Sequence, residues 1–541
     1  MADATVPPMA GGNPGSPSSP ANPDDRRAST GDWIAVIAGA LGALMATLDI
    51  SITNSALPQI QGEVGATGSE GTWISTGYLM SEIVMIPLAA WLTRVFGLRN
   101  FLLGAAVLFT FFSIMCGLSH NLGEIIAGRI GQGFTGGAMI PTAQTIIRMR
   151  LPRKQLPVGM SIFGLIVLLG PLLGPVLGGW LAENISWTWC FFINIPVCVA
   201  LVVLLIVGLP VDKPNWPSFF KADWLGIVGL SIGLSSLTVV LEEGQRNRWF
   251  DSEMIVWLTV VTVVGFILIG ISQFVAKKPM LRMSLLRNPR YASVILIVFV
   301  VGMGLYCISY LLPQFLSGIA GYNAEQSGVV LLMSGLPAFL VMPILPKLLG
   351  SMDLRVMVIS GLVLFGVSCM MDTTLTAQSV GHDFTWSQLL RGAGQVLAML
   401  PLNQASMAAV TAEEAGDASG LYNMARNLGG SIGLALVGIF LDRRTHLHDD
   451  ILRESVTANS VLAHDRIAGN AAAFMAQGSD PAHAHMQALG QLASQIHIQA
   501  TVITYSQTFY LLGIALLVCI PLALFLKTPK RGGSAAPSAG H

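Results

Sequence analysis

Residues 44–58, LMATLDISITNSALP, place one acidic residue, Asp49, inside an uncharged run that begins at Trp33. A run of this length and composition predicts a helix that crosses a lipid bilayer. A carboxylate at that depth costs a few kcal/mol, and buried acidic residues of this kind usually have a partner and a role in moving ions or substrate. The stretch therefore predicts a functional membrane helix, and the rest of the chain must supply the partner of Asp49.

Apolar residues dominate the whole chain of 541 residues. Hydrophobic residues make up 53% and charged residues 11%, against about 25% charged residues in an ordinary soluble domain, and the mean hydropathy is +0.66. We therefore expect an all-α polytopic membrane protein that binds lipid and leaves little room for a soluble domain. Lys plus Arg equals Asp plus Glu at 29 each, so the net charge does not indicate nucleic acid as a partner.

Fourteen apolar stretches are long enough to span a membrane. They lie at 33–56, 72–92, 100–118, 123–147, 157–182, 189–209, 223–241, 254–275, 291–316, 326–349, 354–371, 386–410, 417–441 and 505–527. An even number of spans places both termini on the same side of the membrane. The six cysteines lie in these apolar segments, so we expect no disulfide framework.

Basic residues gather on one side of the membrane in this arrangement. The short loops of that side contain Arg94, Arg99, Arg148, Arg150, Arg153, Lys154, Lys277, Lys278, Arg282, Arg287, Arg290, Lys347 and Arg355. Most short loops of the other side contain none, although Arg246 and Arg248 lie there, and an acidic stretch at 413–417 lies on the basic side. Because basic loops stay in the cytoplasm, we expect both termini to be cytoplasmic.

The chain divides into two similar halves. AMIPTAQ at 138–144 is similar to AMLPLNQ at 398–404, and an arginine precedes each, Arg129 and Arg391. Parallel repeats of this kind are typical of transporters whose halves rock about a central site. The expected units are a tail (1–32), a six-helix bundle (33–209), two additional helices (210–290), a second six-helix bundle (291–527) that contains a long outer loop (442–504), and a tail (528–541).

Five ionisable residues lie within the predicted spans: Asp49, Glu82, Arg129, Arg391 and Arg426. At about 1.5 Å per residue, Asp49 lies about 13 Å and Arg129 about 9 Å from the outer ends of their helices, so the two can meet in depth. Asp49 or Glu82 is a candidate for carrying a proton across the membrane. The alternative is a permanent ion pair that only fixes the position of the helices.

A glycine-rich stretch in the fifth span, GPLLGPVLGG at 170–179, has a regular spacing. It contains Gly170, Pro171, Gly174, Pro175, Gly178 and Gly179. Glycines four residues apart share one helix face, which lets another helix approach closely, and the prolines add bends. We expect a bend or a seal here. Polar residues in the spans are candidates for lining a substrate cavity: Asn54, Gln132, Gln314, Arg391, Gln404, Asn423 and Arg426.

Several motifs in order along residues 33–527 resemble one family. LDISITNSALP, RIGQGFTGGA (129–138), GPLLGPVLGG and GDASGLYNMARNLGGSIG (416–433) are similar to signatures of the fourteen-helix drug:proton antiporters of the major facilitator superfamily, EmrB/QacA type. The resemblance implies a fold of two six-helix bundles plus two extra helices. It also implies that Asp49 takes part in coupling, that Arg129 handles protons, and that GPLLGPVLGG keeps the central cavity from leaking. Gln132 and Gly133 fill the next positions of the fourth-helix motif.

One family motif is only partly present. In AWLTRVFGLR at 90–99, Ala90 replaces the glycine and Arg94 the aspartate of the pattern GxLaDrxGrr, so the charged contact of that aspartate has no obvious equivalent. Asp353 and Arg355 are a possible counterpart in the second half.

Glu82 and the long outer loop are most similar to the EmrB-like branch. That likeness implies a transporter of the inner membrane of a Gram-negative cell that works with a periplasmic adaptor protein and an outer-membrane channel. Residues 442–504 are then either the adaptor contact or a cap without such a role.

No cofactor or metal is expected. The histidines of the long loop, His446, His448, His464, His483, His485 and His497, lack the compact spacing of a metal site. No G-x-x-x-x-G-K-[ST] stretch is present, so the energy source is an ion gradient. We expect proton-driven export of hydrophobic or amphipathic compounds and not an enzyme; the alternatives are a uniporter or symporter for a small metabolite and a membrane scaffold.

Overall fold

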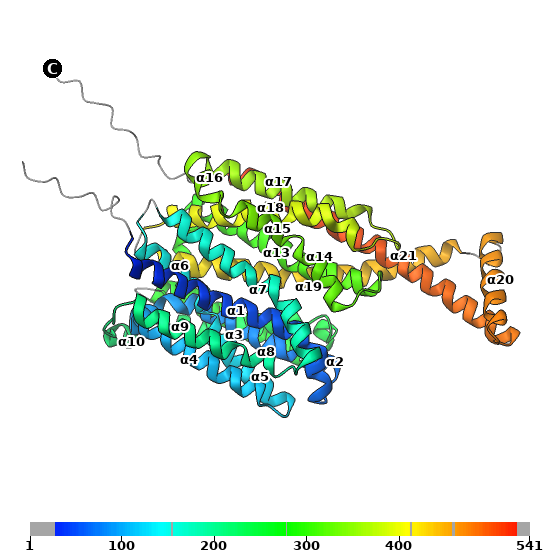
Figure 1. Ribbon diagram of the computed structural model, residues 1–541, viewed down its shortest axis with the longest axis horizontal. Helices are drawn as coiled ribbons and strands as arrows, with labels where there is room; N and C mark the ends of the chain where they lie inside the picture. Colours follow the sequence, from blue (N-terminus) through cyan, green and yellow to red (C-terminus); the bar gives the residue numbers. More distant parts are fainter. Residues whose placement is uncertain (1–27, 153–154, 277–278, 412–413, 457–459, 527–541) are drawn as a thin grey trace, which may run out of the picture.

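The computed structural model of the chain describes residues 28–152, 155–276, 279–411, 414–456 and 460–526. Every regular element in these ranges is a helix, and most helices run along the long axis of the molecule (Figure 1). We call the end where residues 28 and 526 lie the terminal face. The opposite end, beyond which two long helices extend, is the projecting face.

The first bundle comprises the helices up to residue 208. They are α1 (Thr30–Glu63), α2 (Gly68–Gly71), α3 (Trp73–Phe96), α4 (Leu98–Gly117), α5 (Leu122–Gly136), α6 (Met139–Arg150), α7 (Leu156–Asn184), α8 (Trp189–Phe192) and α9 (Asn194–Gly208). α1 begins at a capping box, in which Ser29 and Asp32 satisfy each other's backbone N–H groups. α3 turns directly into α4 because Gly97 has a φ of 82°, a conformation that favours glycine.

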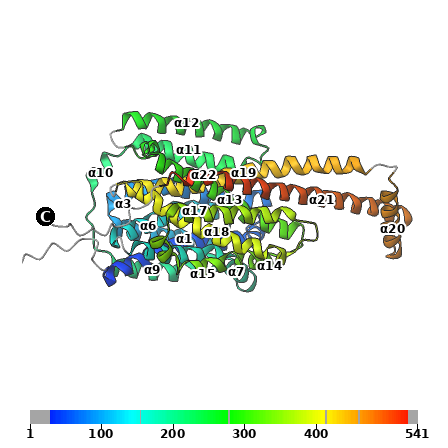
Figure 2. The same cartoon turned by 90° about the horizontal axis from the view of Figure 1, so that it is seen from above.

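Two further long helices lie along one side of the bundles. They and the short elements around them are α10 (Trp216–Phe220), α11 (Trp224–Glu243), η2 (Trp249–Asp251), α12 (Glu253–Val275) and η3 (Met283–Arg287). Figure 2 shows α11 and α12 at the edge of the molecule, with α11 on the inner side. α11 packs against α3 and α19, whereas α12 has many exposed apolar side chains, including Trp257 and Phe266.

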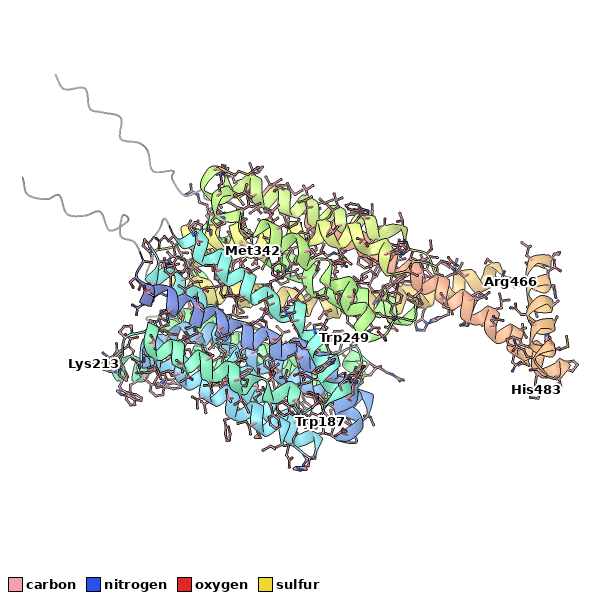
Figure 3. All side chains as sticks on the ribbon, in the orientation of Figure 1. Trp187, Lys213, Trp249, Met342, Arg466 and His483 are labelled. Atoms are coloured by element: carbon pink, nitrogen blue, oxygen red, sulfur yellow. The ribbon has the colours of Figure 1, made fainter. Side chains whose placement is uncertain are left out.

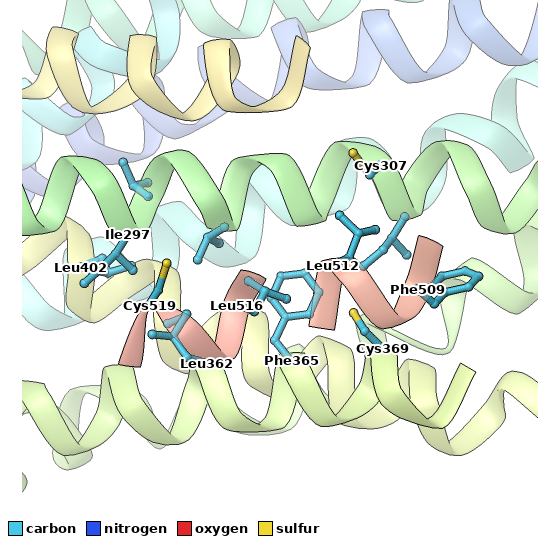
Figure 4. Close-up of a cluster of buried hydrophobic side chains, with 14 of the residues drawn as sticks. Ile297, Cys307, Leu362, Phe365, Cys369, Leu402, Phe509, Leu512, Leu516 and Cys519 are labelled. Carbon is cyan, nitrogen blue, oxygen red and sulfur yellow. The ribbon is translucent and has the colours of Figure 1, made fainter. Parts of the chain in front are cut away.

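The second bundle follows. Its helices are α13 (Pro289–Gly318), α14 (Ala324–Leu332), α15 (Gly335–Val341), α16 (Leu345–Ser351), α17 (Leu354–Met371), η4 (Asp372–Thr374), η5 (Gly381–Phe384), α18 (Thr385–Ala408), α19 (Ala415–Ser455), α20 (Val461–Ala476), α21 (Pro481–Val518) and α22 (Ile520–Ala523). Its core lies between α13, α17 and α21, where Phe365, Leu512 and Leu516 pack together (Figure 4). The expected arrangement of two helical bundles plus two extra helices is confirmed for the described residues.

Each predicted span corresponds to helix, although not always to a single one. Among the described residues, 11 helices are long and apolar enough to cross a membrane. The span predicted at 123–147 is broken between α5 and α6, and the span at 326–349 is divided into α14, α15 and α16. Glycine and proline explain these breaks, since Gly137 lies at the first, and Gly335 and Pro346 lie at the starts of α15 and α16.

The prediction of a long outer loop at 442–504 is wrong for the local structure. The segment is largely helical, because α19 and α21 continue beyond the bundles and α20 crosses their far ends (Figure 2). Arg466 and His483 lie at this distant end (Figure 3). The sequence DRRTHLHDDILRES at 442–455 has no glycine or proline to stop α19, so the helix continues although its polarity changes.

Candidate proton and substrate site

Asp49 lies in the core of the first bundle and is fully buried. Gln132 Nε2 donates to its Oδ1 at 2.9 Å, and Asn194 Nδ2 donates to the same oxygen at 2.7 Å. Arg129 forms a salt bridge with Oδ2. The carboxylate is therefore held by three side chains from α5 and α9, which offset the loss of water.

Arg129 is itself held on several sides. Its Nε donates to the Ile74 carbonyl at 3.2 Å, its Nη1 donates to Gln132 Oε1 at 3.0 Å, and its guanidinium lies 4.4 Å from the centre of the Tyr78 ring. The prediction that Asp49 and Arg129 lie at the same depth and meet is confirmed. Since only 1% of the Arg129 side chain is exposed, neither partner can lose the other without leaving a buried charge.

Two members of this cluster escaped the sequence reasoning. Ser113 of α4 accepts hydrogen bonds from Gln132 at 3.1 Å and from Asn194 at 2.9 Å. Asn194 is the first residue of α9. The one sequence signal that could have identified it is that it is a polar residue within an apolar run. Gln132, a candidate for the substrate cavity, thus belongs to the Asp49 cluster.

The glycine face of α7 packs directly on α1, next to Asp49. A Cβ atom on Gly178 would lie 2.5 Å from the Ile52 carbonyl oxygen, and one on Gly174 would lie 3.1 Å from the Ser51 carbonyl carbon. Gly179 points away, with nothing within 4 Å of such an atom. The predicted close approach of another helix is thereby confirmed.

The opposite face of α7 meets the second bundle. Pro175 lies close to Gly328 of α14, and Leu172 lies close to Gly335 of α15, both in the second bundle. Pro171 has no N–H for the Val167 carbonyl, which instead lies 3.4 Å from the Thr47 hydroxyl of α1. α7 therefore fits between α1 and the second bundle.

Glu82 and Arg426 lie where the two bundles face each other. Glu82 of α3 is buried, and the cations near it are Arg426 of α19 and Arg129 of α5. Arg426 Nε donates to Asn427 Oδ1 at 3.3 Å, and the Tyr306 hydroxyl of α13 donates to the same oxygen at 3.3 Å. Glu82 thus lies between this second polar group and Arg129 of the Asp49 cluster.

The bundles are joined near the terminal face by charged contacts. Arg94 of α3 lies 3.1 Å from Asp417 of α19, and Arg282 also lies 3.1 Å from that carboxylate. The acidic stretch that contradicted the charge pattern therefore has basic partners. Asp353 and Arg355, the suggested counterpart of the loop motif in the second half, take no part in this contact between the bundles. Asp353 caps α17, and Arg355 Nε donates to the Leu526 carbonyl.

Uncharged contacts close the same end. Gln144 Oε1 of α6 accepts hydrogen bonds from the Ser419 hydroxyl at 2.7 Å and from Asn423 Nδ2 at 3.1 Å, both of α19. All three side chains are buried. Asn423, a cavity candidate, is part of this closed contact, so the conformation described is one in which the bundles meet at the terminal face.

The remaining candidates lie apart from one another. Asn54 and Gln314 are exposed, in the halves of α1 and α13 nearer the projecting face, and Gln404 is half-buried on α18. Arg391 is buried in the second bundle in a salt bridge with Asp372, a residue that lies just past the predicted span at 354–371. The structure therefore does not bring the seven cavity candidates together in one place.

Comparisons with known proteins agree with this architecture. The sequence profile of the Major Facilitator Superfamily matches residues 39–434. The chain belongs to this superfamily. It is 32% identical to the colistin resistance protein EmrB of Acinetobacter baumannii, over 92% of this chain and 97% of that protein, and 29% identical to the multidrug export protein EmrB of Escherichia coli, over 92% and 96%.

A solved structure supports the fold of this superfamily member. The human organic anion transporter MFSD10 aligns with a TM-score of 0.53 at 15% identity, over 90% of this chain and 99% of that one. The superfamily consists of transporters, so the chain is a multi-pass membrane transporter of the EmrB-like kind.

Proposed function

We propose that this transporter exports hydrophobic or amphipathic compounds in exchange for protons, by alternating access. The observation that carries the proposal is the Asp49 cluster: a carboxylate in the core of the first bundle, held by Arg129, Gln132 and Asn194. An acid at this depth is held in place only while its partners stay in register, so a change of helix packing changes its affinity for a proton.

α7 is the element that would connect this acid to the movement of the bundles. Its glycine face touches α1 at Ser51 and Ile52, one helical turn from Asp49, and its other face touches α14 and α15. A shift of the second bundle therefore moves α7, and α7 moves the helix that carries Asp49. Close packing on both faces of α7 would hinder leakage along this helix, which is the role that the family resemblance implies for GPLLGPVLGG.

The names of relatives indicate the kind of cargo. The E. coli relative is named a multidrug export protein, and a relative from Neisseria gonorrhoeae, 27% identical over 93% of this chain and 97% of that protein, is named fatty acid resistance protein FarB. Compounds with both an apolar body and a polar group would suit a bundle interface that holds Glu82, Arg426 and Tyr306.

Proteoliposomes that contain the full chain test this function. With ethidium as the probe, an imposed pH gradient should drive ethidium uphill, and ethidium should in turn drive proton movement. The Asp49→Asn/Arg129→Gln double variant removes both charges and so leaves no unpaired buried cation. It should carry ethidium only down its gradient. Uphill accumulation by the double variant would refute the role of Asp49, and downhill transport without proton movement by the unaltered protein would indicate a facilitator.

We further propose an inner-membrane location with both termini in the cytoplasm, and an adaptor protein as the partner of the projection formed by α19, α20 and α21. The far end of this projection exposes apolar side chains, with Leu462 82% and Val461 71% exposed. Isolated exposed apolar residues are common, but two adjacent ones at the start of α20, at the tip of the projection, suit a protein contact.

The variant Leu462→Glu tests the contact. The matched control is Ala473→Glu, at an exposed position of α20, the helix that also contains Leu462. Leu462→Glu should reduce co-purification of a periplasmic adaptor and cellular resistance, and Ala473→Glu should leave both unchanged. Equal co-purification with both variants would contradict the proposal.

A further inference from the structure

The turn that follows α11 lies at the projecting face and contacts both bundles. We call residues 243–249, which begin at the last residue of α11, the α11 turn. It contains two consecutive residues in the left-handed region, Arg248 and Trp249, with φ values of 55° and 54°. Such conformations are unfavourable for residues other than glycine, so the surrounding contacts must hold them in place.

Hydrogen bonds within the α11 turn make it stiff. The Asn247 N–H donates to the Glu243 carbonyl at 3.0 Å, and the Trp249 N–H donates to the Gly244 carbonyl at 2.7 Å. The side-chain amide of Asn247 also donates to the Glu243 carbonyl, at 2.9 Å. The Trp249 ring packs directly on the backbone at Gly244. The turn therefore moves as one piece.

Polar contacts tie the α11 turn to the first bundle. The Thr76 hydroxyl of α3 donates to Glu243 Oε1 at 2.9 Å, and Glu243 is buried. Arg246 lies 3.7 Å from Glu243 Oε2 and donates a hydrogen bond to the hydroxyl of Thr72, the residue before α3. α11 itself also packs along α3. The α11 turn therefore follows the movements of the first bundle.

The side chain of Gln245 extends the α11 turn to the second bundle. Its Nε2 donates to the Gly438 carbonyl of α19 at 2.8 Å. Gly438 is buried, and a Cβ atom on it would lie 1.8 Å from Gln245 Oε1 and 2.8 Å from Gln245 Cδ. Because Gly438 has no side chain, the amide of Gln245 reaches the backbone of α19. Although Gln245 is exposed as a residue, its amide thus joins the two bundles.

We propose that Gln245 is a positioning residue of the transport cycle, which latches α19 to the first bundle while the bundles are joined at the terminal face. Halves that rock about a central site change their spacing at the projecting face in every cycle. Rigid-body movements shift helices at an interface by about 1–2 Å or more, which exceeds the tolerance of a hydrogen bond. Since Gln245 moves with the first bundle and Gly438 with the second, their contact breaks in the opposite conformation. This inference rests on the alternating access of the proposed function.

Gln245→Ala tests the latch, because a contact made in one conformation favours that conformation. Its loss should open the terminal face, where the Ser419 hydroxyl of α19 donates to Gln144. Ser419 lies about 29 Å along α19 from Gly438, so a merely local role of Gln245 would not affect it.

The measurement is the rate at which N-ethylmaleimide labels the Ser419→Cys variant of the full chain in lipid nanodiscs, followed by mass spectrometry. The six native cysteines are buried. Gln245→Ala should raise this rate about threefold, as expected for the loss of one partly exposed neutral hydrogen bond. Arg248→Ala, at an exposed residue of the same turn, is the matched control and should leave the rate unchanged.

Gly438→Ala removes the same contact from the other side, since the added Cβ displaces the amide of Gln245. It should also raise the labelling rate about threefold. The double variant Gln245→Ala/Gly438→Ala should show the same rise and not one of about ninefold, because both changes remove one contact. An unchanged rate in Gln245→Ala, an equal rise in Arg248→Ala, or a ninefold rise in the double variant overturns the inference.

Cross-linking separates this inference from the proposed function. In proteoliposomes, ethidium transport by Gln245→Cys/Gly438→Cys should stop when a short cleavable thiol cross-linker joins the two cysteines, and resume when the link is cut. Continued transport by the linked protein overturns the latch. If the unaltered protein moves ethidium without protons, the proposed antiport fails and the labelling result still decides the latch. If it exchanges protons and Gln245→Ala is labelled like the unaltered protein, only the role of Gln245 fails.

Discussion

Replacing Gly178 by alanine should separate α1 from α7. The added Cβ would lie 2.5 Å from the Ile52 carbonyl oxygen and 3.0 Å from its Cα, whereas ordinary contact begins at 3.4 Å. Both neighbouring atoms belong to the backbone, so a side-chain rotation cannot relieve the clash, and the helices must move apart locally by about 1 Å. Overpacking of this kind costs about 1–3 kcal/mol.

Gly179→Ala is the control on the next residue. Its Cβ meets nothing within 4 Å, and both variants gain the same helix propensity, about 1 kcal/mol for glycine to alanine. The difference in the free energy of unfolding between the two variants therefore isolates the clash. We expect Gly178→Ala to have the lower midpoint of thermal unfolding in detergent, and Gly179→Ala to equal or exceed the unaltered protein.

The same displacement should reach proton coupling. Ile52 lies one turn from Asp49, whose hydrogen bonds from Gln132 and Asn194 are 2.9 and 2.7 Å long. A shift of about 1 Å lengthens them beyond useful range, and the rate of proton-driven ethidium transport should fall about tenfold. Indistinguishable transport and stability of Gly178→Ala and Gly179→Ala would refute the argument that this face sets the position of α1.

Three further outcomes follow from the charged contacts. Asp417→Asn removes the salt bridges that join the bundles at the terminal face, so hydrogen exchange in the first turns of α19 should become faster, whereas Arg290→Gln, at an exposed residue on the same side, should not change it. Asp372→Ala should lower the stability in detergent by about 3–5 kcal/mol, because the buried Arg391 loses its counter-ion, while Asp372→Leu/Arg391→Met should restore most of it. Hydrogen bonds from the His483 backbone and ring lower the pKa of Asp480, so the cap of α21 is stable above pH 3.8 and is lost as pH falls further; exchange of the first α21 amides should rise only there.

The sequence was sufficient for features that depend on local pattern. Apolar length located the spans, and the spacing of Gly170, Gly174 and Gly178 identified the face of α7 on which α1 packs. The depth of Asp49 and Arg129 along their helices also anticipated their contact, because 1.5 Å per residue fixes depth without a structure.

Contacts between distant segments were beyond such reasoning. Asp417 reads as an exception to the charge pattern until its neighbours Arg94 and Arg282, more than a hundred residues earlier, are known. Asn194 and Ser113 have no periodic signal, because a single polar residue in an apolar run does not indicate which helix it faces. The helical form of residues 442–455 was missed because a change to polar residues marks the end of a membrane span and not the end of a helix.

The continuity of α19 has a mechanical consequence. Its residues 442–455 extend the helix by about 20 Å past the predicted end of the span, without a hinge, and α21 runs beside it and is linked to it through α20. Such a stiff pair behaves as a lever whose short arm is embedded in the second bundle. A small tilt of that bundle is magnified at the tip, so a protein attached there would sense mechanically which way the transporter is open.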